Sequence, residues 1–355
     1  MIKTCQLRIN GSIGQAILVL MLSMAMLLIT PSAQAEPPPP PSPFAAAVIN
    51  PGTGLWREVR QRGGPIDGTT QVSGTDAGTL ISIRGEEWRQ LRTEKIIPYS
   101  GYLLAVILAI LVLFRLIRGQ LKINAGRSGM RILRFTYSQR VVHWVAGITF
   151  VILGITGVVL LLGRTLLIPL MGNSAFGVIA SFSKTVHDYL GPVFVISLVF
   201  LFIYYVKDNF FKLRDIQWFV KGGGMFGGHA HAGRFNAGEK TWFWLAILLG
   251  IVVSATGLVL DFPIFGLDRE TMELSLVIHG IAAIIVFGIS FGHMYLATFG
   301  MEGALESMTT GYCDANWAKE HHDDWYEEVK DTAEPAPSDD SSAHGSPGQA
   351  SPSGA

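Results

Sequence analysis

Five apolar runs, each close to the length of a membrane-spanning helix, constrain this chain more than any other feature of its sequence. They cover roughly residues 99–117, 141–162, 185–206, 242–260 and 272–298. A helix needs about 20 consecutive apolar residues to cross a bilayer. Only 15 % of the residues are charged, whereas soluble domains carry roughly 25 %. The sequence therefore predicts an all-α membrane protein with five transmembrane helices.

The first 97 residues read as an exported segment. Residues 1–35 carry a basic start, an apolar core at Ile13–Ile29 and an Ala33-Gln34-Ala35 cleavage site, as in a signal peptide. Because the apolar segment Ile13–Ile29 is long for a signal peptide, an uncleaved membrane anchor is the alternative. Residues 36–97 form a proline-rich linker and a small polar segment, in which "QVSGTDAGTLISIRG" indicates a β-hairpin. This segment is too short for a large core, so we expect a tether or a docking surface.

Basic residues set the expected orientation. The loop between the first two apolar runs and its edges hold seven of them and no acid: Arg115, Arg118, Lys122, Arg127, Arg131, Arg134 and Arg140. The positive-inside rule places that loop in the cytoplasm. We expect an extra transmembrane helix at 98–118, a four-helix domain at 134–328 and a disordered cytoplasmic tail at 329–355. The chain would lie in a bacterial inner membrane, with residues 36–97 in the periplasm.

Composition excludes several classes of site. The formal net charge is zero, which gives no indication of nucleic-acid binding. The two cysteines, Cys5 and Cys313, form no CxxC motif. Covalently attached haem, cysteine-ligated iron–sulfur clusters and cysteine zinc sites are therefore excluded from this chain.

Four histidines lie in or at the edges of the apolar runs: His143, His187, His279 and His293. The expected threading places His187 and His279 near the periplasmic face and His143 near the cytoplasmic face. His293 follows His279 by fourteen residues, or about 21 Å of helix, and about 1400° of rotation returns it to nearly the same helix face. Depth alone therefore predicts two pairs, His187 with His279 and His143 with His293.

Two paired imidazoles at two depths are the ligand sets that two b-type haems need, because neutral imidazoles hold haem iron axially. Small residues nearby would let a flat macrocycle lie against helix backbone, although they also serve ordinary helix packing. A haem-free proton channel or transporter is the alternative from another class. Such a relay normally uses acidic partners inside the bundle, and the apolar runs hold almost none.

Two of the helices share a short pattern. "ITGVVL" at 155–160 and "ATGLVL" at 255–260 follow Trp144 and Trp244 at the same distance along the chain. This similarity indicates a duplication of helix pairs, although two helices with glycine-rich packing faces could also match by chance.

At these residues the chain resembles the cytochrome b (gamma) subunit of respiratory formate dehydrogenase, from about Arg134 to Glu328. The motifs that carry the resemblance are "RFTYSQRVVHWVAG", "KTVHDYLGPVF", "GRFNAGEKTWFW", "LVIHGIAAIIVFGISFGHMYLA" and "WAKEHHDDWYEE". The resemblance implies a di-haem anchor that passes electrons from a periplasmic iron–sulfur beta subunit to a quinone near the cytoplasmic face. A molybdenum or tungsten alpha subunit would oxidise formate. The equivalent subunit of a hydrogenase or of a thiosulfate or polysulfide reductase is the nearest alternative.

The resemblance also implies a quinone pocket beside the inner haem, with Asn236 and Gly238 of "FNAGEK" in it and His293 as a haem ligand. From the residues alone, Asn236 could donate to a quinone carbonyl, and Glu239 or Lys240 could relay protons. Asn236 could equally begin the helix as its N-cap. Arg134 and Arg140 are candidates for pairing with haem propionates, or they only set the topology.

Overall fold

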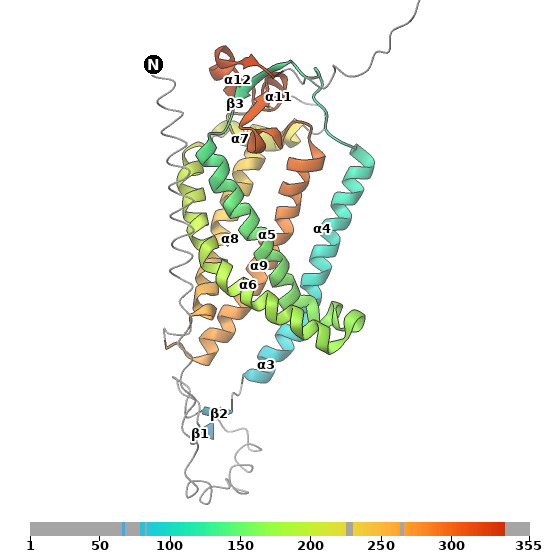
Figure 1. Cartoon of the computed structure of the whole chain (residues 1–355), viewed down its shortest axis with the longest axis vertical. Helices are drawn as coiled ribbons and strands as arrows, with labels where there is room; N and C mark the ends of the chain where they lie inside the picture. The colour runs from blue at the N-terminus through green and yellow to red at the C-terminus, as the bar shows by residue number, and fades with distance from the viewer. Residues whose placement is uncertain (1–65, 68–78, 82–83, 225–229, 263–265, 338–355) are drawn as a thin grey trace, which may run out of the picture.

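Five helices of the computed structural model are long and apolar enough to cross a membrane. The structure describes residues 66–67, 79–81, 84–224, 230–262 and 266–337. The long helices are α4 (Ile97–Arg118), α5 (Tyr137–Leu166), α6 (Ile168–Tyr205), α8 (Ala237–Asp261) and α9 (Arg269–Tyr295). Each contains all or nearly all of one predicted run, which confirms the all-α membrane prediction (Figure 1).

Polar caps fix where three of these helices begin. The Thr136 hydroxyl accepts a hydrogen bond from the Gln139 amide, and the Gln139 side chain accepts one from the Thr136 amide. Helix α5 therefore starts with a capping box. Asn236 starts α8 in the same way. Asp268 accepts from the Thr271 amide at the start of α9. The helices therefore begin a few residues before their apolar runs, because the caps satisfy amides that have no partner within a helix.

Helix α6 begins earlier than the apolar pattern predicts, at Ile168 rather than near residue 185. Gly172 interrupts its first turns with a φ of 78°, a left-handed conformation that glycine adopts without a Cβ clash. The early part presents exposed apolar side chains such as Leu170, Val178 and Phe182. Figure 1 shows this part at the end of the bundle from which α3 (Gly85–Gln90) enters. Polar residues are interspersed among the apolar ones in this part of α6, so it does not form a continuous apolar run and was not predicted as helix.

Helices α5, α6, α8 and α9 form the bundle, and α4 packs beside α9. At mid-length, Phe287 of α9 contacts Phe150 of α5, with ring centres 6.0 Å apart. A Cβ at Gly154 would lie 2.1 Å from the Phe287 ring, so the close approach of α5 and α9 requires a glycine there. Leu104 of α4 joins Leu162, Ile284 and Phe287 in the same cluster.

A small cap covers one end of the bundle. Its strands β3 (Met130–Leu133), β4 (Tyr312–Asp314) and β5 (Glu334–Pro335) pair antiparallel in the order β4-β3-β5. Short helices complete it: α7 (Leu213–Val220), α10 (Glu306–Thr309), α11 (Ala315–His321) and α12 (Asp323–Val329). Short 3-10 and π turns lie on the cap side: η3 (Val206–Asp208), η4 (Gly222–Gly224), η6 (Leu296–Gly300) and η7 (Lys330–Thr332). A further π turn, η2 (Leu91–Ile96), joins α3 to α4.

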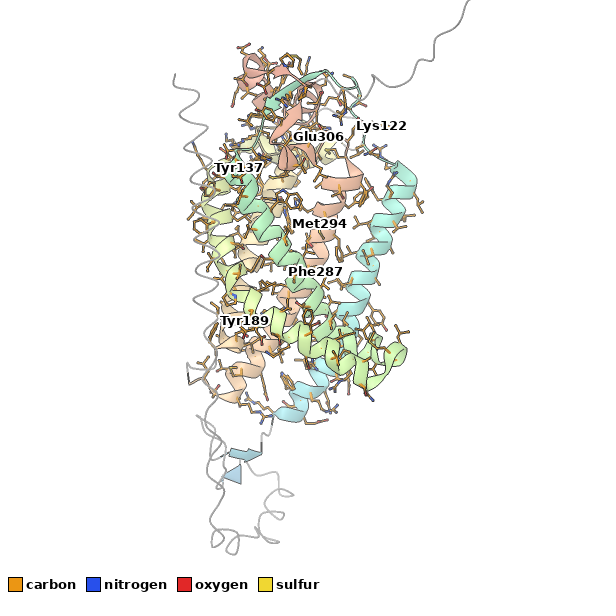
Figure 2. The ribbon with its side chains drawn as sticks, in the orientation of Figure 1. Lys122, Tyr137, Tyr189, Phe287, Met294 and Glu306 are labelled. Atoms are coloured by element: carbon orange, nitrogen blue, oxygen red, sulfur yellow. The ribbon has the colours of Figure 1, made fainter. Side chains whose placement is uncertain are left out.

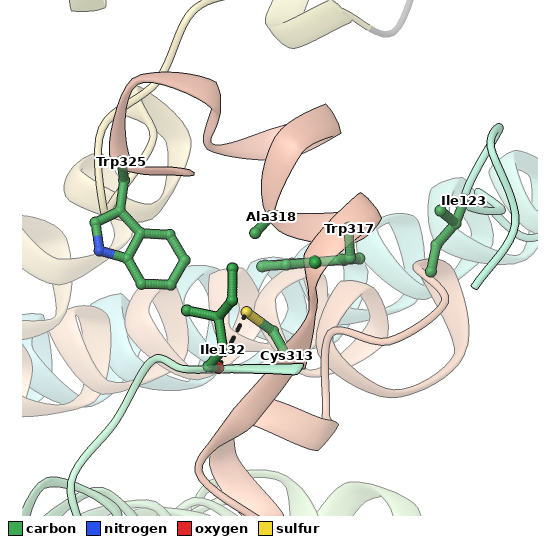
Figure 3. Packing of buried hydrophobic residues seen from close by; sticks show 7 residues of the cluster. Ile123, Ile132, Cys313, Trp317, Ala318 and Trp325 are labelled. Atoms are coloured by element: carbon green, nitrogen blue, oxygen red, sulfur yellow. Dashed lines mark hydrogen bonds between the residues drawn. The ribbon is translucent and has the colours of Figure 1, made fainter. Parts of the chain in front are cut away.

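The cap has an apolar core of its own. Ile132, Cys313, Trp317 and Trp325 are buried together in it (Figure 3). The Cys313 thiol lies 3.7 Å from the Ile132 carbonyl, and burial raises the pKa of this thiol to about 11. A thiol with so high a pKa stays protonated and unreactive at neutral pH.

The cap also corrects the boundary drawn at residue 329. The chain stays ordered through β5, where Arg131 of β3 pairs with Glu334 at 2.8 Å. A serine-, proline- and aspartate-rich composition predicted disorder, but β3 offers this segment an open strand edge. Residues 338–355 of the predicted tail lie outside the described residues.

At the opposite end, β1 (Ile66–Asp67) pairs antiparallel with β2 (Thr79–Ile81). The second strand of the predicted hairpin coincides with β2, but β2 pairs with residues that precede the predicted first strand. The predicted signal peptide at 1–35 and the proline-rich linker at 36–44 lie outside the described residues.

Candidate functional site

The structure brings the four histidines of the bundle together in two pairs. The rings of His143 on α5 and His293 on α9 have their centres 6.3 Å apart. The rings of His187 on α6 and His279 on α9 have their centres 6.1 Å apart. We call these the cap-side pair and the distal pair. Helix α9 contributes one imidazole to each, as the fourteen-residue spacing predicted.

The two pairs lie at different depths along the bundle. Figure 2 labels Met294, next to His293, on the cap side of Phe287, and it labels Tyr189, two residues after His187, on the other side. Aromatic rings fill the level between them: Phe150 lies 5.9 Å from Phe194 and 6.0 Å from Phe287, centre to centre. Packed aromatic rings therefore separate the two pairs.

The separation within each pair fits one metal ion held between two imidazoles. A metal–imidazole nitrogen bond is about 2 Å long, so two such bonds and the inner halves of the two rings separate the ring centres by about 6 Å. The helix faces beside the histidines are also open. A Cβ built at Gly147, Gly280 or Gly292 would meet no atom within 4 Å, so a flat macrocycle has room there. The residues present thus fit haem with two axial histidines.

The surroundings of the two pairs differ. In the distal pair, His187 Nδ1 lies 2.9 Å from the Thr156 hydroxyl, and His279 Nδ1 lies 3.1 Å from the Thr256 hydroxyl. In the cap-side pair, the ring of His293 stacks on Trp242 at 5.0 Å with an interplanar angle of 16°. Helical periodicity predicted no role for these threonines or for Trp242. The threonines do belong to the repeated Thr-Gly pattern at 155–160 and 255–260.

The sequence model of a protein family described as prokaryotic cytochrome b561 matches residues 134–311. That match covers half of the chain and includes all four paired histidines. The chain belongs to the prokaryotic cytochrome b561 family. It is therefore a multi-pass membrane cytochrome b, and haem b is the cofactor that its paired histidines fit.

Several relatives of this cytochrome carry a more specific name. The cytochrome b556(Fdn) subunit of the nitrate-inducible formate dehydrogenase of Escherichia coli K12 is 28 % identical over 211 residues, which cover 56 % of this chain and 92 % of the relative. The cytochrome b556(fdo) subunit of a formate dehydrogenase of the same organism is 26 % identical over 208 residues, 57 % and 95 % of the two chains. A formate dehydrogenase cytochrome b556 subunit of Haemophilus influenzae is 25 % identical over 205 residues, 56 % and 83 %.

The two arginines predicted as partners of haem propionates have other partners in the described part of this cytochrome. Arg134 is buried and donates to Glu239 at 3.0 Å and to the Arg234 carbonyl at 2.9 Å. Its guanidinium also lies 3.1 Å from His322 Nε2. Arg140 donates to the Thr309 carbonyl. Both arginines therefore join the bundle to the cap.

His322 is enclosed by this network. Its Nδ1 lies 2.8 Å from the Gly233 carbonyl, so that nitrogen carries the proton, and its Nε2 faces Arg134. Burial, and then the positive charge of Arg134, lower the pKa of His322 to about 3. The ring is therefore neutral at physiological pH and serves as an acceptor for the guanidinium.

Asn236 and Gly238, the residues predicted to bind quinone, lie at the start of α8. The Asn236 side-chain oxygen accepts from the Glu239 amide at 2.9 Å, and Glu239 accepts from the Asn236 amide at 2.9 Å. A Cβ at Gly238 would lie 3.0 Å from the Trp218 ring of α7. The N-cap reading of Asn236 thus holds, and its side-chain amide nitrogen is the atom left to donate to a ligand.

The two groups considered for proton relay at this end are held in ion pairs. Lys240 lies 2.7 Å from Asp215 of α7, and both side chains are less than 5 % exposed. Glu239 is fixed by Arg134 and by the capping box. These contacts give both groups a structural role at the junction of α8, α7 and the cap.

Proposed function

We propose that this chain is the di-haem membrane subunit of a formate dehydrogenase complex. In this proposal it takes electrons from a periplasmic iron–sulfur subunit, whose own partner is a molybdenum or tungsten subunit that oxidises formate. It passes them to a quinone near the cytoplasmic face. The observation that carries the proposal is the presence of two imidazole pairs at two depths, joined by one helix. The names of the relatives support formate dehydrogenase as the parent complex.

In this proposal, the residues of the chain hold and insulate the cofactors. His187 and His279 would hold one haem b on the periplasmic side, and His143 and His293 would hold a second on the cytoplasmic side. Bound haem b supplies one-electron oxidation and reduction. Phe150, the aromatic rings around it and the apolar helix faces keep water out of the path between the pairs.

The proposed quinone site lies beside the cap-side pair. Asn236 and Gly238 begin α8, and Trp242, one turn further on, stacks on His293. The Asn236 amide nitrogen would donate to a quinone carbonyl. Gly238, against which the Trp218 ring of α7 packs, would complete the site. The basic loops at this end of the bundle support a cytoplasmic position for it, which would agree with proton uptake from that side.

Removing one imidazole at a time tests the proposal. The purified chain is expected to show a reduced-minus-oxidised b-type spectrum with two haems. His279→Ala and His187→Ala should each lose the same haem, and His293→Ala and His143→Ala should each lose the other, because each pair shares one iron. His231→Ala, which changes a histidine outside the bundle helices, serves as the control. A chain without a Soret band, or partners that lose different haems, would contradict the proposal.

A further inference from the structure

Both histidines of the distal pair are held by a threonine of a neighbouring helix. Thr156 of α5 lies 2.9 Å from His187 Nδ1, and Thr256 of α8 lies 3.1 Å from His279 Nδ1. Each hydroxyl also donates to a carbonyl four residues earlier in its own helix, Ile152 at 2.9 Å and Val252 at 2.7 Å. The hydroxyl hydrogen is therefore used, and the oxygen is left to accept.

This arrangement fixes the tautomer of both rings. The Val253 carbonyl lies 3.0 Å from His279 Nδ1, and a carbonyl can only accept, so Nδ1 carries the proton. The Thr156 oxygen requires the same of His187. In both rings the Nε2 lone pair is then the free one, which is the form that binds iron.

The two threonines occupy equivalent places in the repeated pattern. Each threonine is followed by a glycine. A Cβ at Gly157 would lie 3.4 Å from the His187 ring, and a Cβ at Gly257 would lie 3.2 Å from the His279 ring. The Thr-Gly pair thus supplies a hydroxyl and makes room for the ring beside it. The same device appears twice, once for each histidine of the distal pair.

The cap-side pair has no such acceptor among the described residues. His143 Nδ1 is buried there without a hydrogen-bond partner. The ring of His293 contacts Trp242 through its face, and the described part of the chain places no hydrogen-bond acceptor on it. The two pairs therefore differ in the polarisation of their imidazoles.

We propose that Thr156 and Thr256 are positioning residues that hold the reduction potential of the distal haem below that of the cap-side haem. An acceptor on Nδ1–H makes the imidazole a stronger electron donor, which stabilises the oxidised iron. Two accepting threonines act on the distal iron and none on the other. The difference favours electron movement toward the cap side. This inference rests on the proposed function, because it requires haem in both pairs.

Redox titration of the full chain in lipid nanodiscs tests the inference, with optical and EPR detection. Valine has the shape of threonine but no hydroxyl, so Thr156→Val should raise the lower midpoint potential. Thr256→Val should raise it less, because the Val253 carbonyl still accepts from His279 Nδ1. The double variant should raise it further, and the higher midpoint should not move. Thr156→Ser and Thr256→Ser restore the hydroxyl and should return the lower midpoint toward its original value. Thr241→Val is the matched control, because the Thr241 hydroxyl donates to the Ala237 carbonyl and has no hydrogen bond to a histidine of the described residues.

A lower midpoint that stays in place in the double variant, with two haems bound, would overturn the inference and leave the proposed function intact. An independent measurement uses His279→Ala, in which the haem that remains should show the higher midpoint. If that haem showed the lower one, the threonines could not order the potentials as proposed. A wild-type chain without haem would instead reject the proposed function.

Discussion

At the scale of single residues, burial decides the protonation of His322. Its pKa lies at about 3, below its ordinary value of 6.5, first because of burial and second because of Arg134. Between these values the unfolded chain binds a proton that the folded chain does not. The stability that depends on neutral His322 is therefore complete above about pH 6.5 and falls as the pH decreases toward 3.

We expect the melting temperature of the purified chain to fall between pH 7 and pH 5, with a slope of up to about 1 kcal/mol per pH unit from this residue. His322→Gln keeps a hydrogen-bonding side chain without the titration, so its melting temperature should depend less on pH. Thermal unfolding of both proteins across this range checks the difference. Parallel curves would show that another group carries the dependence.

Asn236 combines two possible roles that substitutions can separate. Its oxygen caps α8, and its amide nitrogen is the proposed quinone donor. Asn236→Ser keeps a capping oxygen and removes the amide, so we expect unchanged stability with weaker binding of a quinone-site inhibitor. Asn236→Ala should lose both and cost about 1 kcal/mol of stability. Thermal unfolding and inhibitor titration of the two variants distinguish the roles, and full inhibitor affinity in Asn236→Ser would remove the amide from the site.

At the scale of helices, the contact between Gly154 of α5 and Phe287 of α9 holds together the two helices that carry the cap-side pair, His143 and His293. A Cβ at Gly154 would lie 2.1 Å from the Phe287 ring, so Gly154→Ala must push the two helices apart or move the ring. We expect a loss of roughly 1–3 kcal/mol in the free energy of unfolding and a lower haem content at the cap-side pair, whose two histidines lie on these helices.

Gly101→Ala on α4 is the matched control, since a Cβ there would meet no atom within 4 Å. Haem content by absorption and melting temperature report the two effects. A Gly154→Ala chain that keeps its full haem content and melting temperature would show that Phe287 moves aside without cost.

At the scale of the whole molecule, α4 lies outside the region that the family model matches, residues 134–311. It contributes none of the paired histidines and packs on α9 through Leu104 and Ile107, next to Gly288. A chain that begins at residue 119 should therefore keep both haems, because lipid can replace α4 on an apolar helix face at little cost.

Haem-to-protein ratio and the b-type spectrum of the shortened chain check this expectation. Gly288→Leu offers a second route, since a Cβ at Gly288 would lie 2.7 Å from Ile107 and displace α4 while leaving the helix in the chain. Selective loss of one haem in both variants would show that α4 supports that site.

The sequence by itself determined the five membrane helices and the partners within each histidine pair. Both follow from local regularities, since apolar length sets the spans and the helical rise sets the depth of each imidazole. Only the tertiary structure decided what surrounds those rings. Thr156 approaches His187 from another helix, and helical periodicity does not specify which helix faces meet. The early start of α6 likewise depends on a backbone turn at Gly172. The ordered structure of the β5 segment depends on its pairing with the open edge of β3.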